Sequence, residues 1–316
     1  FDELDITSNQ IETNTYNAKK SASVLYDHTD AAARGEIKGC LTGFTDLDKL
    51  MTMMGGNLII LGGRPGQGKS TFLDSVATNL LTEHGKRIGF FTLEMSAKEV
   101  SARFATHLSG IPSDRITKGK LEDREWPLFT QAIETLASLP FIINDKSGLT
   151  IPQFRVAAKR MYRELGGLDL ICVDYAQLMK ASKKYRNRNE EIGEITKGLK
   201  EVAKELDVPV LAAAQMSRAV DQRSDKRPIL SDLRESGDLE NDADIVVFIH
   251  RPDQYEKVDA DKQNVAEIIV AKHRNGPVGN VELIFRGALT KFENACSKRF
   301  APNESPRWQD RADMGD

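Results

Sequence analysis

Residues Gly63 to Ser70 have the types and the spacing of a phosphate-binding loop. After Gly63 and four further residues come Gly68, Lys69 and Ser70, between the apolar run LIILGG and a helical pattern. Glycines let backbone N–H groups approach phosphates, and the N-terminus of the next helix adds the positive end of a dipole. Lys69 is predicted to reach the β- and γ-phosphates of a nucleoside triphosphate, and the Ser70 hydroxyl to ligate Mg²⁺. The predicted nucleotide-binding residues of the loop are Gly63, Arg64, Pro65, Gly66, Gln67, Gly68, Lys69, Ser70 and Thr71.

Three further side chains with suitable chemistry end predicted strands. Asp174 ends DLICVDY and is predicted to hold the Mg²⁺, because a carboxylate at the end of a central parallel strand faces the ligand crevice. Glu94 ends RIGFFTLE and could polarise the water that attacks the γ-phosphate, as in a nucleotide hydrolase. Gln215 ends PVLAAAQ and could report whether the γ-phosphate is present. The alternatives are a strand-end turn residue for Asp174 and a charge beside the Ser96 helix cap for Glu94.

Basic residues gather in two segments, each of which follows one of these strand ends. The segment SKKYRNRN follows Asp174, and the segment SRAVDQRSDKRP follows Gln215. Positively charged loops there could track a single-stranded nucleic-acid backbone. Charge exposed to water is the other interpretation, and composition alone favours it. The basic residues are Lys183, Lys184, Arg186 and Arg188 in the first segment and Arg218, Arg223, Lys226 and Arg227 in the second.

A pair of cations ends a later strand. The segment AKHRNGPVG carries Lys272 and Arg274, followed by an Asn-Gly turn. Alternate residues of a strand share one face, so the two side chains are predicted to point the same way. Two cations at a strand tip suit an arginine finger that reaches a phosphate on a neighbouring subunit. A hairpin with exposed charges is the alternative.

The apolar pattern predicts the elements that must position these side chains. From Thr42 to about Asp244, short continuous apolar runs alternate with helical patterns. This predicts an α/β fold, of the phosphate-loop kind, in which helices cover both faces of a mostly parallel sheet. The helix after Glu94 opens with a capping box of Ser96 and Glu99. The runs IVVFIHR, NVAEIIVAKHR, NVELIFR and LTKFEN then follow at short intervals, so we expect antiparallel hairpins at the C-terminal end.

The two ends of the chain depart from this alternation. An apolar stripe near the start predicts a helix that packs on its own domain or on a neighbouring copy. The last residues are polar and are predicted to be disordered. The predicted parts are a helical segment over 1–36, an α/β domain over 37–294 and a tail over 295–316. The stripe consists of Ile11, Ala18, Ala22, Leu25 and Ala32.

Composition restricts the class of protein further. The formal net charge of -3 and the pI near 6.1 do not indicate nucleic-acid binding, so any basic surface must be local. The cysteines are Cys40, Cys172 and Cys296, an odd and widely spaced set that indicates a reducing, cytoplasmic setting. The sequence has no apolar run long enough to span a bilayer, so we expect no membrane association.

Seven segments, in this order, resemble the motif series of DnaB-type replicative helicases. The resemblance covers Ile37 to about Asn294 and implies a RecA-like motor domain. The helix before Gly35 resembles the linker helix of that family, which docks on the adjacent subunit of a ring, so the resemblance favours the neighbouring copy. The family's N-terminal collar domain is expected to be absent. The segments are TGFTDLDKL, GGRPGQGKST, TLEMS, LICVDYAQLM, AAAQMSR, LSDLRESGDLENDADIVVFIHR and AKHRNGPVG.

The resemblance implies a role for particular residues. ATP and Mg²⁺ are the implied ligands, with Glu94 as catalytic base and Gln215 as nucleotide sensor. Arg103, on the helix after Glu94, resembles the residue that contacts the nucleotide base. Lys272 and Arg274 resemble the pair inserted across the subunit interface. The implied DNA-backbone contacts are Arg234, Glu235 and Gly237, and the segment before them, with Arg223, is expected to line the channel.

The expected function is therefore an ATP-dependent, 5′-to-3′ DNA helicase motor. It would act as a homo-hexameric ring around single-stranded DNA, with primase and a helicase loader as partners. A RecA-type recombinase that forms filaments shares the phosphate-loop logic and is the first alternative. An ATPase switch whose basic loops bind a protein partner is the second. Closed rings would favour the helicase, and ATPase activity without DNA affinity would favour the switch.

Overall fold

The computed structural model describes residues 17–34, 39–183, 185–217, 220, 223, 225–236, 239–255, 259 and 262–295. The chain divides into two units, Phe1–Gly39 and Cys40–Asp316. The first contains helix α1 (Ala18–Ala33), where the apolar stripe predicts a helix. Ile11 of that stripe lies outside the described residues, as does the tail from Cys296 onward.

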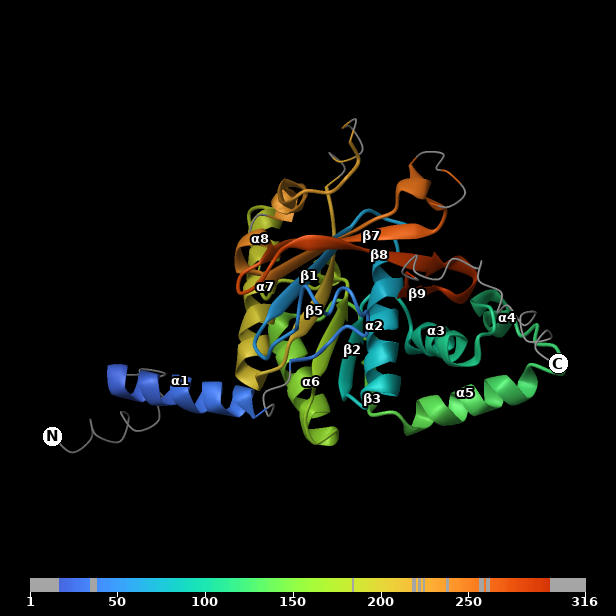
Figure 1. The fold of residues 1–316 in the computed structure, drawn as a ribbon, viewed down its shortest axis with the longest axis horizontal. Helices are drawn as coiled ribbons and strands as arrows, with labels where there is room; N and C mark the ends of the chain where they lie inside the picture. The colour runs from blue at the N-terminus through green and yellow to red at the C-terminus, as the bar shows by residue number, and fades with distance from the viewer. Residues whose placement is uncertain are drawn as a thin grey trace, which may run out of the picture. The chain divides into compact units, whose positions relative to one another are not determined.

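A sheet forms the centre of the second unit (Figure 1). In its described part the strand order is β3-β2-β4-β5-β1-β6-β7-β8-β9. Strands β1 to β6 run parallel, and the sheet continues with β7 antiparallel to β6, β8 antiparallel to β7 and β9 antiparallel to β8. The predicted α/β fold is confirmed, including the antiparallel C-terminal end. The strands are β1 (Leu58–Gly63), β2 (Ile88–Thr92), β3 (Phe141–Asn144), β4 (Leu170–Asp174), β5 (Val210–Gln215), β6 (Ile245–His250), β7 (Val265–His273), β8 (Gly279–Arg286) and β9 (Lys291–Asn294).

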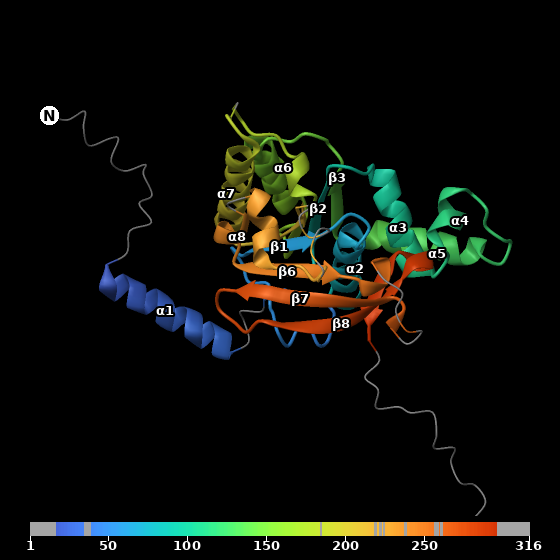
Figure 2. The same cartoon turned by 90° about the horizontal axis from the view of Figure 1, so that it is seen from above.

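Helices connect the parallel strands and cover the sheet. Figures 1 and 2 show α6 and α7 side by side. Helices α4 and α5 follow α3 and were not predicted, although Phe129, Ile133 and Leu136 recur at helical spacing along α5. The helices of this unit are α2 (Lys69–Glu83), α3 (Ala97–Ser109), α4 (Ser113–Thr117), α5 (Trp126–Ser138), α6 (Ile151–Glu164), α7 (Arg188–Leu206) and α8 (Leu239–Asp242), with 3-10 turns η1 (Ala176–Leu178), η3 (Leu230–Ser236), η4 (Pro252–Gln254) and η6 (Gly287–Leu289).

Strand β1 is buried on both faces and divides the core in two. Leu58 and Ile60 pack in a cluster with side chains of α6 and α7. Ile59 and Leu61 pack in a second cluster with side chains of α2 and α3. Alternation along a strand sends successive side chains to opposite faces, so a continuous apolar run is what a strand covered on both sides requires.

The described helices include none that is long and apolar enough to cross a membrane.

Candidate functional site

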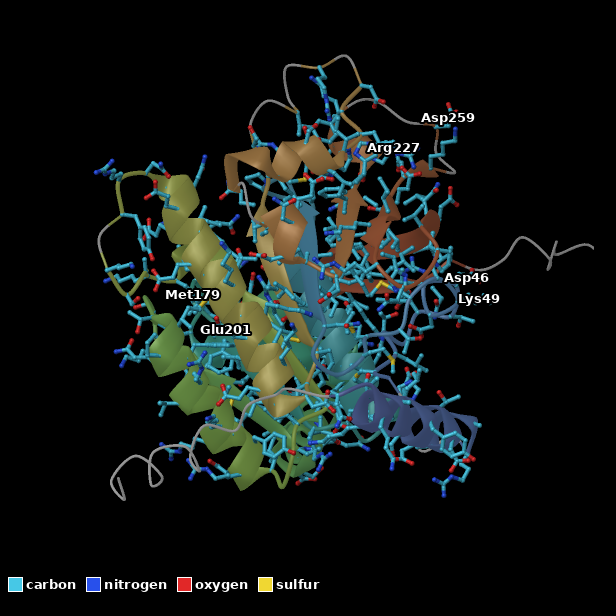
Figure 3. All side chains as sticks on the ribbon, turned by 90° about the vertical axis from the view of Figure 1, so that its left-hand side faces the viewer. Asp46, Lys49, Met179, Glu201, Arg227 and Asp259 are labelled. Carbon is cyan, nitrogen blue, oxygen red and sulfur yellow. The ribbon has the colours of Figure 1, made fainter. Side chains whose placement is uncertain are left out.

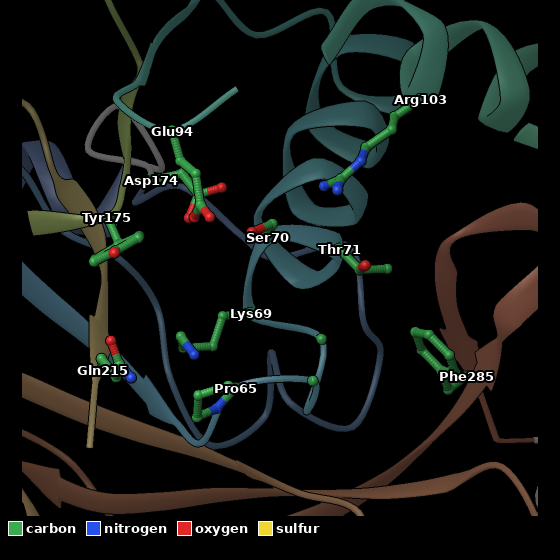
Figure 4. Close-up of a pocket in the computed structure, with 12 residues that line it drawn as sticks. Pro65, Lys69, Ser70, Thr71, Glu94, Arg103, Asp174, Tyr175, Gln215 and Phe285 are labelled. Atoms are coloured by element: carbon green, nitrogen blue, oxygen red, sulfur yellow. The ribbon is translucent and has the colours of Figure 1, made fainter. Parts of the chain in front are cut away.

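A cavity of about 480 Å³ opens where the phosphate loop meets the carboxyl ends of β4 and β5 (Figure 4). Parallel strands present their carboxyl ends at one edge of a sheet, which is where α/β proteins bind ligands. The cavity brings together most of the residues predicted from the sequence to bind or hydrolyse a nucleotide. Its lining residues are Pro65, Gly66, Gly68, Lys69, Ser70, Thr71, Glu94, Arg103, Asp174, Tyr175, Gln215 and Phe285.

The loop between β1 and α2 requires glycine at two positions. Gly66 has φ 80 and Gly68 has φ 97, a region of backbone conformation that L side chains rarely adopt. A Cβ on Gly68 would also lie 3.0 Å from Cζ of Phe292, whereas one on Gly66 would meet nothing within 4 Å. Gly68 is the N-cap of α2, so its conformation turns the chain directly into the helix.

The loop is fixed to the strands on either side of β1. The Arg64 guanidinium donates to the backbone oxygen of Met216, just after β5, at 3.2 Å. The backbone N–H of Arg251, just after β6, donates to Oε1 of Gln67 at 2.7 Å. Gln67 is buried, and neither Gly63, the last residue of β1, nor Arg64 lines the cavity. These three predicted residues therefore hold the loop in place through their own contacts.

Lys69 is held by the loop itself. Its Nζ donates to the backbone oxygens of Gly63 at 2.8 Å and of Arg64 at 3.2 Å. Burial lowers the pKa of Lys69 to about 8, and the nearby Asp174 opposes that shift. Charged phosphate oxygens are better acceptors for an ammonium than these carbonyls, so a triphosphate can draw Nζ into the cavity.

Asp174 and Ser70 form a candidate Mg²⁺ site. Asp174 is the last residue of β4 and is buried. Burial raises the pKa of its carboxyl, and a hydrogen bond with Ser70 lowers it. A carboxylate and a hydroxyl are ligands that suit Mg²⁺, which keeps waters and substrate phosphates in its remaining positions. No group of three His, Cys, Asp or Glu residues in the described part of the chain could hold a metal ion alone.

Glu94 stands on a short turn between β2 and α3. The Thr92 hydroxyl accepts from the backbone N–H of Met95 at 3.1 Å and donates to its carbonyl at 2.9 Å. Ser96 and Glu99 form the predicted capping box, which is confirmed. The backbone N–H of Leu93 donates to the carbonyl oxygen of Asp174 at 2.7 Å, which ties this turn to the end of β4. The turn leaves the Glu94 side chain exposed in the cavity, opposite the loop that carries Lys69 (Figure 4).

Gln215 is the exposed last residue of β5. The side-chain amide of Gln177 brackets its backbone: Nε2 donates to the Gln215 carbonyl at 3.1 Å, and Oε1 accepts from the Gln215 N–H at 3.2 Å. Gln177 lies in η1, directly after Asp174 and Tyr175. The ends of β4 and β5 are thus joined at the cavity by one side chain.

Two lining residues escaped the sequence analysis. Tyr175 follows Asp174, so the strand-end reasoning could have found it. Phe285 comes from β8, and no local signal connects that strand with the phosphate loop. The Arg251 guanidinium lies 3.9 Å from the centre of the Phe285 ring and holds this aromatic side chain at the cavity.

Lys272 and Arg274 lie away from this cavity. Lys272 Nζ donates to the Glu240 carbonyl at 2.5 Å, and Arg274 donates from Nη2 to the Asn241 carbonyl at 2.7 Å. Arg274 Nη1 also pairs with Oδ1 of Asp244 at 3.3 Å. As predicted, the two cations share a direction, since both reach α8. That short helix follows η3, which carries the predicted DNA-contacting residues Arg234 and Glu235.

The predicted DNA-contacting residues are only partly described. Arg234 and Glu235 lie in η3, but their side chains fall outside the described residues, as does all of Gly237. Arg223 Nη2 donates to Oδ2 of Asp232 at 2.9 Å and to the carbonyl of Arg227 at 2.8 Å. The bond between Arg223 and Asp232 therefore attaches the second basic segment to η3.

Two further basic side chains of these segments have partners. Arg227 pairs with Glu267 of β7 at 2.7 Å, and Figure 3 shows it at the same end of the molecule as Asp259. Lys183 lies 5.4 Å from the centre of the Tyr185 ring. Lys184 and Arg218 lie outside the described residues.

The topology, the loop between β1 and α2 and the carboxylates at neighbouring strand ends define a phosphate-loop protein of the RecA-like class. Within that class, the family described as "DnaB-like helicase C terminal domain" matches residues 39–294. The chain belongs to this family, as its motif series predicts.

Relatives and solved structures agree with this assignment. The chain is 41% identical over 274 residues to the replicative DNA helicase DnaB of Geobacillus stearothermophilus, covering 86% of this chain and 60% of that protein. It is 44% identical over 266 residues to the DnaB of Pasteurella multocida, covering 83% and 57%. The chain thus spans less than two thirds of the length of these relatives.

Two solved structures share the fold. One is described as an ATPase domain, with a TM-score of 0.82 and 34% identity over 89% of this chain and 100% of that one. The other is a DnaB-like replicative helicase described with its interactions with primase, with a TM-score of 0.80 and 33% identity over 92% of this chain and 70% of that one.

Proposed function

We propose that this chain is the motor of an ATP-driven replicative DNA helicase, working as a homo-hexameric ring that moves 5′-to-3′ along single-stranded DNA. The observation that carries the proposal is the separation of two sets of charged groups. The nucleotide cavity holds Lys69, Asp174 and Glu94, whereas Arg274 and Lys272 lie beyond the reach of that cavity, beside α8. A cation pair on a surface of its own can serve the cavity of a neighbouring subunit.

In this proposal each residue of the cavity has one task. The loop N–H groups and Lys69 bind the triphosphate, and Ser70 and Asp174 hold the Mg²⁺, which would neutralise phosphate charge. Glu94 orients and deprotonates the attacking water. Gln215 contacts the γ-phosphate, and its backbone bonds to Gln177 carry a change at that phosphate to the end of β4. Arg103 contacts the nucleoside.

The neighbouring subunit supplies the remaining charge. Arg274 and Lys272 would stabilise the negative charge that develops on the transferred phosphoryl group. Helix α1 would dock on an adjacent subunit and hold the ring together. In this proposal the chain consists of a linker segment over residues 1–36, a motor domain over 37–294 and a tail over 295–316.

The proposed DNA contacts are to the backbone and ignore base sequence. Arg234, Glu235 and Gly237 would follow the phosphates, with Arg223 positioning the segment that precedes them. The primase named for one structural relative supports primase as a partner, and a helicase loader is proposed as a second partner. A replicative role also suits the cytoplasm of a bacterium or of a phage-infected cell.

A strand-displacement assay on forked DNA tests this function. Forks with only a 5′ tail or only a 3′ tail are incubated with ATP, Mg²⁺ and the protein. We expect displacement that depends on ATP and on the 5′ tail on the loading strand. ATP hydrolysis without DNA affinity would instead indicate a switch protein. Open helical filaments without strand displacement would indicate a recombinase.

A further inference from the structure

Asp74 is a buried carboxylate beside the nucleotide cavity that the proposed function does not use. It lies on α2, one helical turn after Ser70, and its side chain is only 2% exposed. Nη1 of Arg103 lies 2.9 Å from Oδ2 of Asp74, and Arg103 lines the cavity. The Asp74 carboxylate, which does not line the cavity, therefore holds the Arg103 guanidinium, which does.

Folding stability does not account for this pair. Asp74 is buried and Arg103 is partly exposed, so the pair loses hydration mainly at the carboxylate, and apolar residues in place of a buried ion pair are often as stable or more so. Burial raises the pKa of Asp74 to about 7, and Arg103 opposes that shift. The packing of α2 against α3 alone therefore does not favour a charged pair at this position.

A second contact already attaches α3 to α2. One helical turn beyond the pair on each helix, Oγ1 of Thr78 lies 2.9 Å from Nδ1 of His107. Nε2 of His107 lies 2.7 Å from the carbonyl oxygen of Thr290. This deeper contact does not line the cavity, so it separates the docking of the two helices from the placement of Arg103.

Arg103 lies toward one end of the cavity. In Figure 4, Gln215 lies to the left of Lys69, Glu94 and Asp174 lie above it, and Arg103 and Phe285 lie to the right. A triphosphate held by Lys69 with its γ-phosphate near Glu94 would extend its nucleoside toward Arg103 and Phe285. A guanidinium can bond or stack with a base only if its plane is fixed, and one bond to Asp74 fixes it while other N–H donors remain.

We propose that Asp74 is a positioning residue that fixes Arg103 for recognition of the nucleoside of the bound triphosphate. This inference rests on the proposed nucleotide binding and adds to it a residue that never touches the ligand. The negative charge of Asp74 would weaken binding of any polyphosphate, so its role must be read from the preference for a nucleoside over bare phosphate.

The test compares dissociation constants for ATP and for inorganic tripolyphosphate, measured by competition with a fluorescent ATP analogue. The ratio of the two constants cancels the charge effect that both ligands share. Wild type, Asp74→Asn, Arg103→Ala and the double variant are compared, with thermal unfolding to confirm that each is folded. We expect Asp74→Asn to reduce the preference for ATP roughly tenfold, Arg103→Ala to reduce it at least as much, and the double variant to equal Arg103→Ala.

Thr78→Val is the control, because it breaks the deeper contact between the same two helices and nearly preserves volume. It also removes the bond from the Thr78 hydroxyl to the Asp74 backbone carbonyl at 2.8 Å, but it leaves the Asp74 carboxyl unchanged. It should leave the preference for ATP unchanged. The inference is overturned if Asp74→Asn keeps the wild-type preference, if its effect adds to that of Arg103→Ala, or if Thr78→Val produces the same loss. If the wild-type protein binds ATP, each of these outcomes overturns only the inference about Asp74 and leaves the proposed function unaffected. If the wild-type protein binds no ATP, the inference and the proposed function are both overturned.

Discussion

Arg274 and Lys69 lie at opposite ends of β1. The backbone N–H of Arg274 donates to the Asp244 carbonyl at 2.9 Å, and the N–H of Asp244 donates to the carbonyl of Leu58, where β1 begins. Lys69 Nζ donates to the carbonyl of Gly63, where β1 ends. A strand of this length spans roughly 17 Å at about 3.3 Å per residue. Arg274 therefore lies far from the phosphate loop of its own chain.

This separation predicts complementation between two inactive variants. Arg274→Ala should bind ATP but hydrolyse it roughly 10³-fold more slowly, the loss expected when an arginine finger is removed. Lys69→Ala should lack productive binding yet keep Arg274. Mixing the two under conditions that form rings should restore part of the ATPase activity, because some interfaces then join an intact loop to an intact finger.

A deletion provides the control for that mixture. A mixture in which both variants also lack residues 11–34 should show no recovery if helix α1 is needed for assembly. If mixed rings form and the activity stays absent, Arg274 acts within its own subunit and the shared site must be abandoned.

Glu94→Gln should separate binding from hydrolysis. The side chain keeps its shape but loses the base, so ATP affinity should stay near the wild-type value while hydrolysis falls roughly 10²-fold or more. Single-turnover hydrolysis and equilibrium binding measure the two effects. Glu99→Gln, three residues from the Ser96 cap, is the matched control and should hydrolyse ATP normally. Normal hydrolysis by Glu94→Gln would remove it from the role of base.

ATP affinity should fall at alkaline pH because of Lys69. In the ligand-free protein its pKa is lowered to about 8, and a bound triphosphate favours the charged form. Above pH 8 binding must therefore take up a proton, and the dissociation constant should rise by up to tenfold per pH unit. Calorimetry between pH 7 and 10 in two buffers measures both quantities. Lys69→Arg stays charged, so its affinity should not change over this range; a parallel decline would point to another group.

The same pKa shift of Lys69 predicts that folding stability rises with pH, whereas ATP affinity falls. The unfolded chain carries Lys69 with a pKa near 10.5, so between pH 8 and 10.5 it binds more protons than the folded chain. The contribution of Lys69 to the free energy of unfolding therefore increases as pH rises through this window. Urea unfolding of wild type and of Lys69→Met at pH 7.5 and 9.5 measures this contribution. The advantage of Lys69→Met should shrink at the higher pH, and a constant difference would contradict the shift.

Single-stranded DNA binding should report on Arg234 and Arg223 differently. If Arg234 contacts a phosphate, Arg234→Ala should make the slope of log affinity against log salt shallower by about 0.7. Arg223 is bonded to Asp232, so Arg223→Ala should weaken binding through the loop, with little change in slope. Fluorescence anisotropy from low to high salt measures both. An unchanged slope for Arg234→Ala would mean that Arg234 contacts no DNA phosphate.

The sequence correctly predicted those cavity residues whose placement depends only on their position at the end of a strand. Asp174 and Gln215 end continuous apolar runs, and parallel strands bring such ends together, so their meeting at the loop could be expected. Phe285 could not be expected, because it lies on β8, whose place in the sheet depends on its antiparallel pairing with β7 and β9. Asp74 could not be expected either, since a carboxylate in a helix is normally a surface residue.

The basic segments show a different limit. Charge counts along the sequence do not say which cations already have partners, and Arg223 and Arg227 both pair with acids of their own chain. Asp232 lies nine residues after Arg223, in η3, whereas Glu267 lies on β7, which only the folded sheet brings near Arg227. The partner of Arg227 could therefore not be inferred from spacing.

Because Arg274 and Lys69 lie at opposite ends of one strand, the number of complete sites in an assembly depends on whether the assembly is open or closed. If every working site takes its loop from one subunit and its finger from the next, an open row of subunits always has one site fewer than it has members. Only closure makes the two numbers equal. The specific activity of a preparation, followed while rings are opened or closed at constant protein concentration, would then count the open ends directly.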